Sequence, residues 1–162
     1  MTNAPKAIEL AIYETIRAFA TVGDDVSFRP WQALAATVTD GDYSRKYPYI
    51  DIRCAPPSTD ENAITKTCVA SILCGTIVSE DESHAGVNTL YEAVQGVCDS
   101  VYDQFMTTEA AELTAFKASF ASYAPDVNFG GLTFGDGLVP YDDDGISMIG
   151  ITLAVHYSHK RT

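Results

Sequence analysis

Two stretches of the chain repeat their apolar residues at helical spacing. Residues 4–20 place one apolar stripe on a helix that Pro5 can begin and Gly23 can end. Residues 83–105 form a clearer stripe, with polar residues on the opposite side. Both patterns predict amphipathic helices that bury one face. The stripes consist of Ile8, Ile12, Ile16 and Phe19 in the first helix, and Val87, Leu90, Val94, Val97, Val101 and Phe105 in the second.

Three other stretches have the pattern of strands. Residues 47–54 have Pro48 at their entry and Pro56 and Pro57 after their end, and proline is tolerated at strand ends and edges. Residues 64–78 are apolar on both faces, which predicts a central strand covered by a helix on one side and by protein, including a neighbouring subunit, on the other. Residues 146–157 alternate strictly and should present one strongly apolar face.

The remaining segments predict smaller elements. Residues 108–123 have helical spacing, with Thr107 or Thr108 as the N-cap and Glu109 in the first turn. Glycines in residues 129–141 indicate a hairpin or loop with a short strand at 132–134. Together the patterns predict one α+β domain over residues 1–162, with a mixed, mostly antiparallel sheet covered by helices and a loop or arm at 28–46.

Composition and charge restrict the function. At 162 residues the chain is long enough for one core, and its net charge is -12 with only ten Lys and Arg residues. Tight DNA binding needs basic residues opposite the phosphates, so we expect neither such binding nor docking on an anionic membrane. An acidic surface is compatible with a passage through which DNA slides without sticking. No signal-like start and no apolar run of ~20 residues is visible, so we expect synthesis in a reducing cytoplasm.

The cysteines and the acidic loop do not have the spacing of known metal sites. Cys54, Cys68, Cys74 and Cys98 match neither a CxxC pair nor a zinc pattern, so we expect four free, buried thiols. The acidic run at 142–144 resembles a calcium loop, but an EF-hand alignment places Pro140 and Ile151 where ligands are required. Residue 84 is a histidine without a nucleophile elbow in the sequence. We therefore expect no catalytic, cofactor-binding or metal-binding residues.

Four residues are candidates for contacts between subunits. Leu10 and Tyr13 point away from the buried stripe of their helix, and Trp31 lies in a segment without an evident core role. Gly96 lies on the polar side of its helix, where glycine costs up to ~1 kcal/mol relative to alanine, and a close contact with another subunit would explain it.

The order of these elements resembles the tail terminator proteins of long-tailed bacteriophages. The similarity covers most of the chain: the N-terminal helix, the segment Tyr47-Pro48-Tyr49-Ile50-Asp51-Ile52, the apolar strand at 64–78, the helix at 87–105, and the last strand after an acidic turn. The resemblance implies a structural virion protein without enzymatic activity or cofactor. Such a protein is made in the host cytoplasm and located in the tail or neck of the virion.

The resemblance also implies partners. A terminator forms a ring of identical subunits, usually a hexamer. The ring caps the tail tube protein and joins the tail to the head-tail connector or stopper protein. DNA passes through the ring without specific binding. Three features depart from the pattern of this family: the cysteines, the segment 28–46 and the extra helix at 108–123. They leave open the alternative that the chain is another neck component, such as a stopper or tail completion protein. The alternative class is a small-molecule or divalent-cation-binding α/β domain that uses acidic loops at 40–42 and 136–144.

Overall fold

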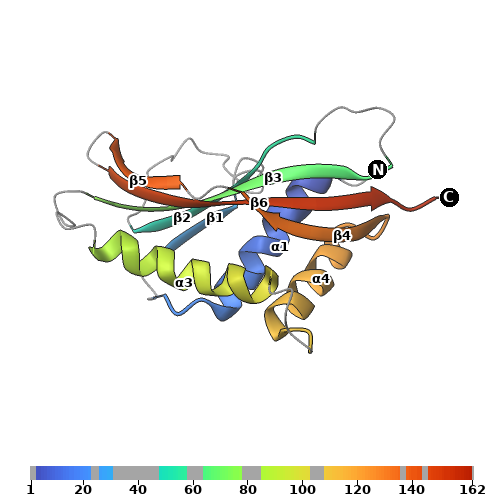
Figure 1. Ribbon diagram of the computed structural model, residues 1–162, viewed down its shortest axis with the longest axis horizontal. Coiled ribbons are helices and arrows are strands. Elements are labelled where there is room, and N and C mark those ends of the chain that lie inside the picture. The colour runs from blue at the N-terminus through green and yellow to red at the C-terminus, as the bar shows by residue number, and fades with distance from the viewer. Residues whose placement is uncertain are drawn as a thin grey trace, which may run out of the picture.

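The computed structural model describes residues 3–22, 26–30, 48–57, 64–77, 85–102, 108–135, 138–143 and 146–161. These residues form helices and strands of one α+β domain, as the sequence predicts (Figure 1). The helices all lie on the same side of the sheet. The elements are α1 (Ala4–Phe19), β1 (Ser27–Pro30), β2 (Tyr49–Cys54), β3 (Lys66–Ile77), α3 (Ala85–Tyr102), α4 (Ala111–Tyr123), β4 (Val127–Phe134), β5 (Leu138–Asp143) and β6 (Ile146–His159).

The sheet has six strands in the order β1-β2-β3-β6-β4, and β5 also pairs with β6. Strands β1 and β2 run parallel, while the other pairs are antiparallel, so the predicted mixed, mostly antiparallel sheet is confirmed. The longest ladder joins β3 to β6, from Lys66 opposite Tyr157 to Ile77 opposite Ile146. This ladder forms the centre of the domain.

Helix α1 begins with a side-chain cap. Asn3 accepts a hydrogen bond from the backbone N–H of Lys6 at 3.1 Å, and Pro5 lies in the first turn, as predicted. The stripe of Ile8, Ile12 and Ile16 is buried, but the prediction for Phe19 is wrong, because that side chain is 37% exposed. Phe19 is the last residue of α1, so no further helical turn shields it.

Helix α3 packs beneath β3 and β6 on its predicted face (Figure 1). The predicted stripe is buried in the described part of the helix, and Cys98 joins it. The last member of the predicted stripe, Phe105, lies outside the described residues. The buried members are Val87, Leu90, Val94, Val97 and Val101.

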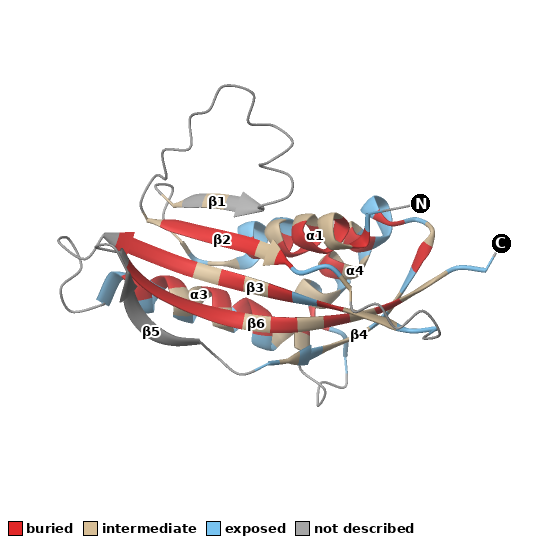
Figure 2. Ribbon diagram, turned by 90° about the horizontal axis from the view of Figure 1, so that it is seen from above, coloured by how far each residue is buried: buried red, intermediate tan, exposed pale blue. Residues whose placement is uncertain are grey.

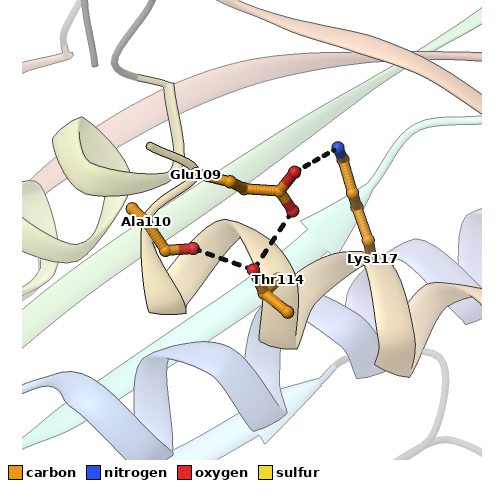
Figure 3. A network of polar contacts seen from close by, with 4 residues as sticks. All are labelled: Glu109, Ala110, Thr114 and Lys117. Carbon is orange, nitrogen blue, oxygen red and sulfur yellow. Dashed lines mark hydrogen bonds and ion pairs between the residues drawn. The ribbon is translucent and has the colours of Figure 1, made fainter. Parts of the chain in front are cut away.

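The predicted start of α4 is wrong. The helix begins at Ala111, and its N-cap, Ala110, makes no side-chain hydrogen bond. Glu109 instead lies before the helix and reaches into it, accepting from Thr114 Oγ1 at 3.1 Å and pairing with Lys117 Nζ at 3.2 Å (Figure 3). Thr114 Oγ1 also contacts the carbonyl oxygen of Ala110 at 3.2 Å. Side chains from the second turn therefore stabilise the helix start in place of a threonine cap.

Two strands occupy the region where the glycines predict a hairpin or loop. β4 and β5 do not pair with each other but lie one after the other along β6. A bulge in β4 lies between Phe129 and Gly131, and Gly131 has a φ of 137°, which favours glycine. These glycines therefore serve a bulge inside a strand, and the short strand predicted at 132–134 is the end of a longer one. Of the predicted arm at 28–46, the first residues belong to β1 and residues 31–46 lie outside the described part.

Candidate subunit-contact surfaces

One face of the sheet has no helix on it among the described residues (Figure 1). Strand residues alternate between the two faces, and Cys68, Ala70, Ile72 and Cys74 of β3 are buried on the helix side. Val69 points to the other side and is 42% exposed. The central place and the helix-covered side predicted for this strand are confirmed, and the cover of its second side by protein stays a prediction. We call the other side the helix-free face, made up here of Thr67, Val69, Ser71, Leu73, Thr133, Thr152, Ala154 and His156.

The helix-free face has a central strip of small and hydroxyl side chains around Val69. Most of these residues are half-buried, as the colours along β3 and β6 show (Figure 2). Val69 lies opposite Ala154, and Thr67 lies opposite His156. The strip contains no Lys, Arg, Asp or Glu. On the neighbouring strand β2, the partly exposed Arg53 lies opposite Ser71 and borders the strip. A strip of small side chains suits contact with another protein surface better than capture of a small molecule.

His156 is held between two threonines on this face. Thr67 Oγ1 lies 2.8 Å from Nδ1 of the imidazole, and Thr133 Oγ1 lies 3.1 Å from Nε2. A neutral imidazole has one donor and one acceptor nitrogen, so one threonine accepts a hydrogen bond and the other donates one. Both ring nitrogens are thus occupied, and His156 joins β3, β6 and β4 rather than offering a base or a metal ligand.

The other end of the sheet is closed by larger side chains. Tyr49 of β2 is fully buried, and its ring lies where a Cβ on Gly75 would be, 2.3 Å from the ring atom Cζ. Asp51 is also buried and pairs with the Arg53 guanidinium at 3.5 Å. Arg53 lies opposite Ser71 and its side chain is 42% exposed, so the accessible part of the face extends from Val69 to this guanidinium.

The predicted interface residues lie on different elements. Leu10 and Tyr13 of α1 are half-buried, and the Tyr13 ring meets Phe28 of β1 edge-on at 6.0 Å. The Arg17 guanidinium lies 5.7 Å from the Tyr13 ring centroid. Tyr13 is therefore partly covered within the chain itself, which the sequence pattern could not indicate because Phe28 is distant in sequence.

Gly96 is separate from that pair. It is exposed on α3, and a Cβ added there would have no neighbouring atom within 4 Å. It therefore does not contact Leu10 or Tyr13, while a partner could approach its backbone closely. Trp31 lies outside the described residues. The interface assignment of all four residues stays a prediction.

Helices α1 and α4 are joined on their exposed side by a carboxylate. Both Ser119 Oγ and Tyr123 Oη donate hydrogen bonds to Glu14. This hydrogen bond raises the pKa of the Tyr123 hydroxyl, because the protonated form is the donor. The two helices consequently form one continuous layer, and the contact gives no sign of reaction chemistry.

The cysteines form two close groups in the core. All four are free and buried, as predicted. Cys54 and Cys68 are hydrogen-bonded to each other, and Cys68 Sγ lies 3.7 Å from the Tyr157 hydroxyl. The sequence pattern missed this pair, since the residues come from two strands whose register only the structure provides. Among the described residues no group of three or more His, Cys, Asp or Glu side chains could hold a metal ion.

The sequence analysis also missed Glu9, a carboxylate within the core. Glu9 of α1 is fully buried, and its Oε1 accepts the backbone N–H of Cys54 at 2.7 Å. The interaction ties α1 to the end of β2. No sequence signal could indicate it, because the partner is a backbone group 45 residues away.

Replacement of Glu9 should show the strength of this tie. Glu9→Leu leaves the Cys54 N–H without that acceptor in the core, so we expect a loss of about 1–3 kcal/mol in the free energy of unfolding. Glu9→Gln keeps a carbonyl acceptor and should lose less. Urea titrations of both variants measure the difference, and equal losses in the two would contradict the role of the hydrogen bond.

The hollows of the domain do not favour a ligand site. A small hollow of about 20 Å³ lies between the helices and the sheet and is lined by Ile12, Val97, Phe116 and other residues that are mainly apolar. A wider hollow of about 290 Å³ lies between α3, α4 and β4, and Lys117 in its lining already pairs with Glu109. The acidic loop 40–42 and most side chains of 136–144 lie outside the described part of the chain.

Comparison with known proteins leaves the family open. No family model matches the chain, and no curated protein sequence matches it. Within the described residues, no helix is long and apolar enough to cross a membrane.

Proposed function

We propose that this chain is a structural virion protein that caps the phage tail tube as a homohexameric ring and joins the tail to the head connector or stopper. The observation that carries the proposal is the helix-free face, on which the central strand β3 exposes Val69 among small, uncharged side chains. A subunit with helices on one face and, among the described residues, none on the other is suited to packing against its neighbour. The order of elements supports the terminator assignment.

The charge of the chain fits a ring through which DNA passes. A net charge of -12 per subunit repels phosphates, so DNA in the channel is not retained. The same charge opposes association between subunits at low ionic strength, where the Debye length is long. We therefore propose that the free protein is monomeric at low salt and forms its ring on a tail tube. Identical subunits in a head-to-tail arrangement either close into a ring or grow into a filament, and a capping component needs closure.

Two other functions compete with this one. Another neck component, a stopper or a tail completion protein, agrees with the same fold and surface, and would bind the connector without capping an isolated tube. A divalent-cation-binding α/β domain would depend on the acidic loops instead. A thermal shift with calcium or magnesium tests that class, and the terminator proposal predicts no change in melting temperature.

A charge placed on the helix-free face should prevent assembly. Val69→Glu introduces a carboxylate into the proposed contact, and we expect at least a tenfold loss of ring formation because an unpaired charge is costly to bury between subunits. Since Val69 is exposed in the monomer, the melting temperature of the Val69→Glu monomer should differ little from that of the parent chain. Light scattering at moderate salt, with tail tubes present, measures the assembly.

The matched control is Ile64→Glu. Ile64 is 75% exposed and precedes β3, so it carries the same type of change outside the helix-free face. It should assemble like the parent chain. If Val69→Glu assembles as well as Ile64→Glu, the helix-free face is not the subunit contact.

A further inference from the structure

The thiols of Cys54 and Cys68 are neighbours in the core of the domain. Cys54 ends β2 and lies opposite Ala70, so Cys68 is two residues along β3 and on the same face. The two side chains are hydrogen-bonded, and both are buried. No covalent bond joins them. Two adjacent strands thus hold a pair of thiols in contact.

Groups from three elements surround this pair. Glu9 of α1 accepts the backbone N–H of Cys54, the Tyr157 hydroxyl of β6 lies next to Cys68, and Lys66 lies two residues before Cys68 on β3. The hydrogen bond with Cys54 lowers the pKa of Cys68 to about 7, with support from Tyr157 and Lys66 and against the effect of burial. The same hydrogen bond, together with burial, raises the pKa of Cys54.

We propose that Cys54 and Cys68 form an oxidisable dithiol that hydrogen peroxide converts to an intramolecular disulfide between β2 and β3. The Cys68 thiolate attacks one peroxide oxygen, the O–O bond breaks, and the released hydroxide takes a proton to become water. Cys68 is now a sulfenic acid. The Cys54 sulfur loses its proton and attacks the Cys68 sulfur, the S–O bond breaks, and a second water leaves. Two thiols and one peroxide give one disulfide and two waters.

The other two cysteines provide a comparison inside the same chain. Cys74 of β3 and Cys98 of α3 are near enough to influence each other electrostatically. Burial raises the pKa of each thiol to about 12, so neither is a thiolate near neutral pH. Because the thiolate is the nucleophile, these two should stay reduced under conditions that oxidise Cys68.

Closure of the disulfide should stabilise the fold. The bond would link residues 14 positions apart and thereby restrict the unfolded chain. For a domain of this size we expect a rise of roughly 5–10 °C in the melting temperature. The inference does not rest on the ring, so the two proposals can fail separately.

The test uses the full reduced chain and hydrogen peroxide. Before treatment, alkylation under denaturing conditions without reductant should modify all four thiols; after treatment it should modify only Cys74 and Cys98. Mass spectrometry of the digest should then show a Cys54–Cys68 linked peptide that dithiothreitol separates. The oxidation rate should rise to about pH 7 and then level off, whereas an ordinary thiol continues to rise toward about 8.5.

Three variants separate the steps. In Cys54→Ser, oxidation by peroxide should stop at the Cys68 sulfenic acid, which dimedone traps. In Cys68→Ser, neither the sulfenic acid nor the disulfide should form. Cys98→Ser is the control and should still form the disulfide. Four alkylated thiols after peroxide treatment of the parent chain, or a link through Cys74 or Cys98, would overturn the proposal, and neither outcome depends on the folding of a variant.

Discussion

Val94→Asp should destabilise the domain by about 4 kcal/mol or more. Val94 is fully buried on α3, in the layer that packs against β3 and β6. An aspartate there either buries an unpaired charge or must take up a proton, and both are costly. Typical domains have only 5–15 kcal/mol of stability, so this loss is a large fraction of the total. Circular dichroism during urea titration measures the loss.

A substitution on the outer side of the same helix is the control. Thr89 is exposed on α3, so Thr89→Asp introduces the same carboxylate into water. Its effect should remain within about 0.5 kcal/mol. Similar losses for Thr89→Asp and Val94→Asp would mean that the buried face of α3 is assigned incorrectly.

Gly75→Ala should be the most damaging exchange of a glycine for alanine in the described chain. The new Cβ would lie 2.3–2.6 Å from three atoms of the Tyr49 ring, which is less than any tolerated contact. Tyr49 is fully buried on the adjacent strand and cannot turn into solvent. We expect a loss of about 1–3 kcal/mol from overpacking, measured as a shift of the urea midpoint.

Gly96→Ala is the matched exchange in open space. No atom lies within 4 Å of its new Cβ, and alanine favours a helix by up to ~1 kcal/mol, so this variant should be slightly more stable. In a double-mutant cycle, Tyr49→Ala should remove most of the cost of Gly75→Ala. Independent, additive effects of those two substitutions would show that the ring does not cause the loss.

The parts of the fold with a strong local pattern could be predicted from the sequence. The stripe on α3 and the alternation of β6 depend on residues close in sequence, and both are confirmed. The central place of β3 also follows from its sequence, because apolar residues occur on both faces of the strand. The predicted helices and strands alone could not show that α1, α3 and α4 lie on the same side of the sheet, because that arrangement depends on packing across the whole domain.

The features that the sequence does not indicate have a common physical origin in distant partners. The glycine pattern predicts a turn around Gly131, whereas this residue allows a bulge in a strand that pairs with β6. The contact of the Tyr13 ring with Phe28 is likewise not visible in the helical pattern. Glu9 and the Cys54–Cys68 pair depend on contacts between elements far apart in the chain. Each of these features requires the register of the sheet before it can be seen.

The central claim is that copies of this chain form a closed ring on the end of a tail tube. Electron microscopy of isolated tail tubes, mixed with the protein at moderate salt, tests it directly. The ring proposal predicts a cap at one end of each tube, with sixfold symmetry in averaged end views, and loss of the cap with Val69→Glu but not with Ile64→Glu. Bare tube ends, together with a protein that remains monomeric by light scattering in the same mixture, would contradict it.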